Sequence, residues 1–395
     1  MRSILVLSIL TLYAGIAQAQ PQTFSSGSTG ADGALTYAAN LGTVYFPPSG
    51  LAQRANNIYN FTTITIGAGT TVRVSGWAIN SAVYWLAQSD VTIAGTLDIS
   101  GQPGHAPNSP AYRAPSEPGA GGYSGGVALA GTGQSATRGN GPGGGAAAIA
   151  PSPFGGGGTF SESSYLQPLI GGSGGGGGSS GYGGGAGGGA ILIASSTMIT
   201  IPSGGTIDAR GGSNPTTALG GGGSGGAVRL VSNTIAVTGT IYIAGGTAYF
   251  DSQNGTGKVN YGGPGIVRLE GFALSGVGQV NGGTALTSFP YNLALPVGGP
   301  STVSVTKVNN VSINANPFSF PDATITAGTA VPVVISGVNI PSGTTGNLNI
   351  YSENAADQVI PFTLTGTLQS TTATVNVPYP SGGSRGFAKA VWTSQ

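Results

Sequence analysis

Short runs of Ile, Val and Leu alternate with Thr, Ser and Asn along much of the chain and end at Gly turns. Four segments repeat one pattern, an apolar strand, a break, an alternating strand, a Gly, a short strand and then Gly-Gly: residues 82–101, 190–212, 227–246 and 265–283, with a half-copy at 59–76. One repeat cannot bury its own apolar face, so stacked repeats are expected. The pattern predicts an all-β fold, a right-handed parallel β-helix with glycine-rich insertions, over residues 20–289.

Alternation within a strand predicts which side chains point inward. In the half-copy, Ile64, Ile66, Val72 and Val74 share one parity and are expected in the core. The threonines between them and Arg73 are expected outside. Thr pairs of this kind suggest an ice-binding surface, but that would need a flat Thr array on every repeat, and the later repeats do not keep it in the sequence.

Glycine tracts precede three of the repeats, at residues 171–189, 220–226 and 262–265. Backbone without side chains forms extended threefold helices that pack side by side, as in collagen. We therefore expect an ordered glycine-rich layer along one flank; the alternative is a mobile loop, because polyglycine loses the most entropy on ordering. The excursion 102–167, which holds the single histidine, His105, is interpreted as a loop domain or as further glycine-rich strands.

The composition changes near residue 290, where glycine becomes less frequent. Seven short apolar runs with Pro, Gly and Ser turns follow and predict an immunoglobulin-like β-sandwich over residues 301–395, joined by a linker at 290–300. We expect this domain to cover an open end of the β-helix. The runs are 302–308, 322–326, 330–337, 347–353, 359–366, 372–379 and 386–394.

The first nineteen residues carry one Arg, an apolar run from Ile4 to Ile16 and the small-x-small triplet Ala17-Gln18-Ala19. This pattern predicts a secretory signal peptide, residues 1–19, cleaved after Ala19, and hence a secreted or cell-surface protein. The apolar run is too short to span a bilayer, so integral membrane insertion is not expected. Cys is absent, which excludes disulfides and thiolate sites.

Charged residues make up only 6% of the chain, and Lys and Arg are scattered singly. A nucleic-acid partner, which requires a basic face, is therefore not expected. One His and no Cys leave neither a zinc ligand set nor the usual serine-hydrolase constellation.

Aligning the repeats places four polar residues at equivalent positions: Asp98, Asp208, Tyr242 and Asn281. If the repeats stack, Asp98 and Asp208 lie on neighbouring strands, about 5 Å apart. Two carboxylates at that distance would act as acid and nucleophile on a glycoside, or bind Ca²⁺, the one cofactor considered. The plain alternative is a solvent-facing polar ladder.

A second ladder of the alignment contains Trp85, Leu192, Arg229 and Arg268, with Glu270 two residues further on. Arginines beside a carboxylate would hold an acidic sugar; the alternative is an exposed Arg pair with one ion-pair partner. Tyr84 and Trp85 are candidate sugar-stacking residues, with Tyr242 and Asn281 as further ligand-binding candidates. Alternation puts part of the aromatic cluster in the core.

The stretch "GADGALTYAANLGTVYFPPSG", Gly30 to Gly50, resembles the opening of pectin-lyase-like β-helical proteins, matching at Gly30–Gly33 and Gly42–Pro48. The amphipathic helix that the family carries between these motifs is missing. The resemblance implies a polysaccharide lyase or glycoside hydrolase, with an Arg such as Arg229 or Arg268 as the base of a lyase. Residues 24–290 more broadly resemble glycine-rich secreted β-helix proteins of bacteria and phage, of which some adhesin- and tailspike-like members bind glycans.

These observations favour a secreted structural or adhesive β-helix protein that binds a polysaccharide, cell envelope or matrix surface without catalysis. The scarcity of acid–base residues and the near-neutral charge support this hypothesis. The alternative is a polysaccharide lyase or glycoside hydrolase of pectin-lyase-like fold, with Asp98, Asp208, Arg229, Arg268 and Glu270 as its site.

Overall fold

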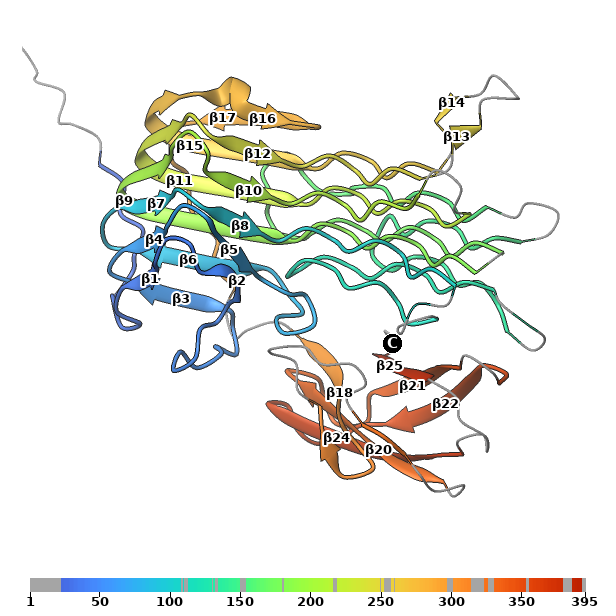
Figure 1. Ribbon diagram of the computed structural model, residues 1–395. Coiled ribbons are helices and arrows are strands. Elements are labelled where there is room, and N and C mark those ends of the chain that lie inside the picture. The colour runs from blue at the N-terminus through green and yellow to red at the C-terminus, as the bar shows by residue number, and fades with distance from the viewer. Residues whose placement is uncertain are drawn as a thin grey trace, which may run out of the picture.

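The computed structural model describes residues 23–392, apart from 108, 110–112, 130, 132–133, 150–153, 180, 216–218, 249, 252–256, 259, 297–300, 314–322, 326–329, 353–354 and 379–385 (Figure 1). The predicted signal peptide lies outside the described residues. The described part is nearly all β, as expected, with one short 3₁₀ helix at Val277–Gln279. No helix in this part is long and apolar enough to cross a membrane.

Two parallel sheets form the first part of the chain, and each repeat adds strands to both. In the first sheet the order β1-β4-β7-β9-β11-β15-β17 is extended by β3 and β6, because the long strand β9 pairs with β6 through its first half and with β7 through its second. The strands are β1 (Leu35–Tyr37), β3 (Ile58–Phe61), β4 (Ile64–Ile66), β6 (Val83–Ala87), β7 (Val91–Ile93), β9 (Ala190–Ile201), β11 (Ala227–Val237), β15 (Ile266–Ser275) and β17 (Thr284–Ser288).

The second parallel sheet has the order β16-β12-β10-β8-β5-β2. Its registers match the alignment of the repeats, since Thr206 lies opposite both Thr96 and Thr240. Its strands are β2 (Gly42–Tyr45), β5 (Thr70–Arg73), β8 (Thr96–Asp98), β10 (Thr206–Asp208), β12 (Thr240–Tyr242) and β16 (Val280–Asn281).

One apolar core lies between the two parallel sheets. The four residues expected inside, Ile64, Ile66, Val72 and Val74, are fully buried in it, which confirms the parity assigned to the half-copy. Burial of such residues, each contributing roughly 1.5–3 kcal/mol, is what holds the stacked repeats together.

Thr65 and Thr71 point outward as expected, whereas Thr70 has the inward parity and is buried. Arg73 has the outward parity but is only 5% exposed, because Asp98 and Glu117 pair with it.

Extended glycine-rich chains run out from these sheets and back, forming a layer of side-by-side segments beyond the strands (Figure 1). We call this the glycine layer. The bonded segments include residues 99–107, 113–129, 134–148, 154–160, 170–189, 209–215, 219–226, 243–248 and 260–265, with the gaps stated above. Most of the described residues of the excursion 102–167 belong to it as extended glycine-rich segments, although none forms a sheet strand, so the second of the two interpretations is the nearer one. The glycine tracts are ordered, which contradicts the mobile-loop alternative.

A period of three governs the bonding of the segment 171–178. The N–H groups of Gly172, Gly175 and Gly178 donate to residues 188, 185 and 182, whereas those of Gly171, Gly174 and Gly177 donate to residues 121, 140 and 137. The two remaining positions, Ser173 and Gly176, donate to the hydroxyl oxygen of Ser224 and to the carbonyl oxygen of Gly156. One segment therefore donates hydrogen bonds in three directions around its axis, as a threefold extended helix does.

Close packing explains why glycine is required there. A Cβ on Gly177 would lie 1.8 Å from the carbonyl oxygen of Val127, and one on Gly176 would lie 1.8 Å from that of Ala146. Hydrogen bonds between neighbouring segments offset the entropy that polyglycine loses on ordering. The segments can approach closely enough to form these bonds only because glycine has no side chain.

The C-terminal part contains two antiparallel sheets, ordered β19-β18-β20-β24-β23 and β22-β21-β25, with an apolar core between them. Six of the seven predicted runs coincide with strands; the described residues of 322–326 form none. The strands are β18 (Thr302–Val308), β19 (Val311–Ser312), β20 (Val331–Val338), β21 (Thr345–Ser352), β22 (Gln358–Thr363), β23 (Thr365–Thr367), β24 (Ser370–Val377) and β25 (Gly386–Trp392); a separate pair joins β13 (Phe250–Asp251) and β14 (Gly257–Lys258).

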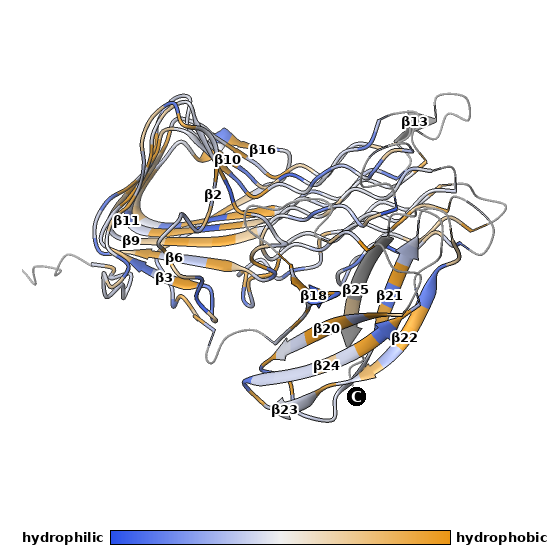
Figure 2. Cartoon of the chain, turned by 60° about the horizontal axis from the view of Figure 1, so that its bottom comes forward, coloured by the Kyte–Doolittle hydropathy of each residue, from blue (hydrophilic) through white to orange (hydrophobic). Residues whose placement is uncertain are grey.

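These antiparallel sheets lie along the glycine layer (Figures 1 and 2). Arg113 and Gln134 of the layer donate hydrogen bonds to the carbonyl oxygen of Ser352 at the end of β21. The expectation that this domain covers an end of the stacked parallel sheets is therefore wrong. It lies instead against the glycine layer, which holds it through the side chains of Arg113 and Gln134.

Candidate functional site

The outer face of the second parallel sheet carries two columns of polar side chains, which together we call the ladder face. Consecutive members are opposite one another in the register of β2, β5, β8, β10, β12 and β16. The inward positions between them are apolar: four are fully buried and Val44 and Val280 are partly buried against the same core. The threonine column is Thr43, Thr71, Thr96, Thr206 and Thr240, and the mixed column is Tyr45, Arg73, Asp98, Asp208, Tyr242 and Asn281.

The structure brings together the four residues that the alignment placed at equivalent positions. Asp98 is opposite Asp208, Asp208 is opposite Tyr242, and Tyr242 is opposite Asn281. Neighbouring strands are about 4.8 Å apart. The sequence alignment therefore located a real column of side chains.

Each of the two carboxylates is paired with an arginine. Arg73 bonds Oδ1 of Asp98 at 3.0 Å and approaches Glu117 at 3.4 Å. Arg210 bonds both oxygens of Asp208, with the shortest contact at 2.6 Å, and its guanidinium lies 4.9 Å from the ring centre of Tyr242. The hydrogen bond to Asp208 raises the pKa of Arg210 above its usual value.

This pairing argues against acid–base chemistry at the column. Glycoside hydrolysis needs one carboxyl placed to donate a proton to the leaving oxygen, whereas Arg210 engages both oxygens of Asp208 and Arg73 engages Oδ1 of Asp98. A Ca²⁺ ion would have to compete with two guanidinium groups for the same oxygens. Among the described residues, no group of three or more His, Asp or Glu is arranged to hold a metal.

The threonine column corrects the expectation that the later repeats lose the Thr array. Thr96, Thr206 and Thr240 continue it across successive repeats. The first parallel sheet carries a second column, Thr36, Thr65, Thr92 and Thr200. The column of the ladder face is one Thr wide and lies beside charged side chains, so it does not form the flat two-dimensional array that ice binding needs.

The second predicted ladder was aligned one residue out of register at its first member. Tyr84, not Trp85, lies opposite Leu192, whereas Trp85 lies opposite Ile193. A shift of one residue moves a side chain to the other face of a strand. Trp85 is fully buried, so it is a core residue and not a sugar-binding platform.

The neighbours of the two aromatic residues agree with these assignments. The ring of Trp85 packs against Phe46 at 4.8 Å and Phe61 at 6.3 Å. Tyr84 is also buried, in an apolar cluster on the outer side of the first sheet that includes Leu192, and burial raises its pKa. Neither is available as a ligand-binding surface.

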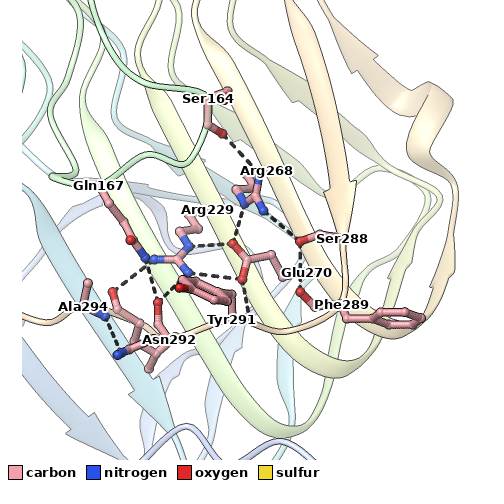
Figure 3. Close-up of polar contacts among 11 residues, drawn as sticks. Ser164, Gln167, Arg229, Arg268, Glu270, Ser288, Phe289, Tyr291, Asn292 and Ala294 are labelled. Carbon is pink, nitrogen blue, oxygen red and sulfur yellow. Dashed lines mark hydrogen bonds and ion pairs between the residues drawn. The ribbon is translucent and has the colours of Figure 1, made fainter.

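Arg229, Arg268 and Glu270 form a buried ionic cluster on β11 and β15 (Figure 3). Glu270 is fully buried and accepts from Nε of Arg229 at 2.8 Å, from Nε of Arg268 at 2.7 Å and from the backbone N–H of Tyr291 at 2.9 Å. The side chain of Arg229 is only 1% exposed. The alternative of an exposed Arg pair is therefore wrong.

The remaining donors of this cluster hold two other segments in place. Arg229 donates to the carbonyl oxygens of Asn292 and Leu293, and Arg268 donates to that of Ser164 (Figure 3). The cluster thus attaches residues 289–295 and the loop around Ser164 to the first sheet. Because these groups bond protein atoms, they do not form an open site for an acidic sugar.

Arg73, within the mixed column, and Arg210, outside it, pair with the candidate carboxylates, and sequence reasoning did not identify either of these partners. Arg210 lies two residues after Asp208, and its guanidinium donates to that carboxylate. A spacing of two between an acid and a base is a local sequence signal that predicts this pair. A comparison of the chain with protein-family models, curated proteins and solved structures finds no match. The function is therefore inferred from the geometry.

Proposed function

We propose that the protein is a secreted structural or adhesive protein whose ladder face binds a polysaccharide, cell envelope or matrix surface without catalysis. In this proposal residues 20–289 are a right-handed parallel β-helix and residues 301–395 an immunoglobulin-like sandwich. The resemblance of residues 24–290 to glycine-rich secreted β-helix proteins of bacteria and phage is consistent with the first of these domains.

One observation carries the proposal: the two in-register columns of the ladder face. They present hydroxyl groups, ion pairs and the two aromatic rings of Tyr45 and Tyr242 at a regular spacing of about 4.8 Å along several strands. A polysaccharide also repeats its hydroxyl groups regularly. Many weak hydrogen bonds in register sum to useful affinity, because each contributes roughly 0.5–1.5 kcal/mol.

The second candidate is a glycoside hydrolase or polysaccharide lyase. The register of Asp98 with Asp208 favours it, because their separation suits a carboxylate pair. Their ion pairs with Arg73 and Arg210 count against it. The two functions differ in a measurable product, namely released oligosaccharide.

The test uses cosedimentation of the mature protein with insoluble plant, bacterial and animal polysaccharides, with products read by mass spectrometry. The triple variant Thr96→Val, Thr206→Val, Thr240→Val removes hydroxyls from the ladder face and keeps the strand propensity. The matched control, Thr65→Val, Thr92→Val, Thr200→Val, changes the other threonine column. We expect the first to weaken binding by about tenfold or more and the second to leave it unchanged.

Equal binding by both triple variants would show that the ladder face is not the binding surface. Release of defined oligomers, abolished by Asp98→Asn or Asp208→Asn, would replace the adhesive function with catalysis. Binding without release, reduced only by the ladder-face variant, would support the proposal.

A further inference from the structure

A polar cavity of about 240 Å³ lies between the glycine layer and strand β21. Thr137, Arg138 and Asn140 line it from the layer, and Asn349 and Tyr351 line it from the strand. The strand alternates Leu348 and Ile350 into the antiparallel core, which turns Asn349 and Tyr351 outward, toward the layer. The cavity is thus built by two parts of the chain that are more than two hundred residues apart.

Several polar groups around this cavity keep hydrogen-bonding capacity. Arg138 donates one hydrogen bond, to the carbonyl oxygen of Gly144 at 3.3 Å, and it is exposed, so it stands at the opening. Within the described part of the chain, neither the amide of Asn349 nor the hydroxyl of Tyr351 makes a hydrogen bond. The Asn140 amide nitrogen bonds Ser124, which leaves its oxygen as an acceptor.

The charge balance at the cavity favours an anion. The acidic group nearby, Asp357, is bonded through both oxygens to Arg113, so that pair is neutral overall. Arg138 forms no ion pair with any described carboxylate and adds one unbalanced positive charge. A guanidinium with free N–H groups binds a carboxylate through two parallel hydrogen bonds.

The volume of the cavity limits the size of the ligand that it can hold. Pockets for drug-sized molecules measure roughly 300–1,000 Å³, and this cavity is smaller. An aromatic hydroxyl, two amides and a Thr hydroxyl around one Arg suit a compact ligand that carries hydroxyl groups and one carboxylate.

We propose that this cavity binds one acidic monosaccharide unit, with its carboxylate on Arg138 and its hydroxyl groups on Asn140, Asn349 and Tyr351. The site is separate from the ladder face and does not depend on it. Because the ligand contacts both the glycine layer and β21, its binding also strengthens the contact between them.

Isothermal titration calorimetry of the full mature chain tests the proposal with glucuronate and galacturonate. Glucose and galactose are the neutral counterparts, and acetate tests a carboxylate without the sugar. We expect the acidic sugars to bind at least tenfold more tightly than the neutral sugars and than acetate. Arg138→Gln is expected to weaken acidic-sugar binding at least tenfold, and Tyr351→Phe by a few-fold.

The control is Arg54→Gln, which removes an exposed arginine outside both the cavity and the ladder face and should leave binding of the monosaccharides unchanged. Circular dichroism and the melting temperature establish that each variant is folded. No binding of any sugar, equal binding of acidic and neutral sugars, equal binding of acetate, or full binding by a folded Arg138→Gln would each overturn the site. None of these outcomes bears on polysaccharide cosedimentation by the ladder face.

Discussion

The guanidinium of Arg113 donates to both carboxylate oxygens of Asp357, at 2.6 and 2.9 Å, across 244 residues of chain. Arg113 also donates to the carbonyl oxygens of Ala128, Ser135 and Ser352, and its side chain is fully buried. Its backbone φ of 62° is unusual for a residue other than glycine. A single side chain thus connects two segments of the glycine layer with the C-terminal sheets.

Removing the anion of this pair should loosen the C-terminal sheets. Asp357→Ala leaves the buried Arg113 without its counter-charge, and loss of one partner of a buried pair typically costs about 3–5 kcal/mol. We expect urea unfolding to show a separate early transition for the C-terminal sheets, and small-angle scattering to show a larger radius of gyration. The matched control is Arg210→Gln, whose half-exposed side chain should change stability by less than about 1 kcal/mol. A single unshifted transition for Asp357→Ala would contradict this role.

A second prediction concerns the glycine layer. Gly177→Ala brings a Cβ within 1.8 Å of the carbonyl oxygen of Val127, so two backbones must separate. We expect a loss of roughly 1–3 kcal/mol or more in the free energy of unfolding, measured in urea. At Gly278 an added Cβ meets nothing within 4 Å, so Gly278→Ala should be neutral or slightly stabilising. Similar losses for both variants would mean that close packing is not what requires glycine in the layer.

The repeats made much of the architecture predictable. Strand alternation identified the inward residues such as Ile64 and Val72, and the regular placement of the glycine tracts indicated an ordered layer. The alignment also located the column of Asp98, Asp208, Tyr242 and Asn281. These features depend on local periodicity, which can be read directly from the order of the residues.

Other features depend on exact register or on distant contacts, and these were missed. Trp85 and Tyr84 exchange faces when the alignment moves by one residue, because the side-chain period of a strand is two. Burial of the Arg229–Glu270 pair depends on residues 289–295, which pack over it. The partnership of Arg113 with Asp357 leaves no local signal at all.

The buried ionic cluster provides a third prediction. Glu270→Gln leaves Arg229 and Arg268 buried with no anion, and an amide nitrogen accepts none of the hydrogen bonds that the carboxylate oxygen accepted. We expect a loss of about 3–5 kcal/mol in urea unfolding and faster hydrogen exchange at the amide of Tyr291, which donates to Glu270. Arg268→Gln keeps the pair of Arg229 with Glu270 and should cost less. Equal losses for the two variants would show that Glu270 is not the centre of the cluster.

His105 provides the last prediction, because it is the single histidine of the chain. Burial lowers its pKa below the usual 6.5, outweighing a hydrogen bond to the carbonyl of Pro115, and its Nε2 is buried with no hydrogen-bond partner among the described residues. The unfolded chain therefore takes up a proton at a higher pH than the folded chain does. The stability that the neutral ring contributes is complete above about pH 6.5 and declines as the pH falls toward the lowered pKa of the folded state. In urea unfolding, the free energy of unfolding of the wild type should fall between pH 7.5 and pH 5.5. The fall should be smaller in His105→Asn, because Asn does not titrate. If both proteins lose the same stability over this interval, carboxylates and not His105 govern the acid sensitivity.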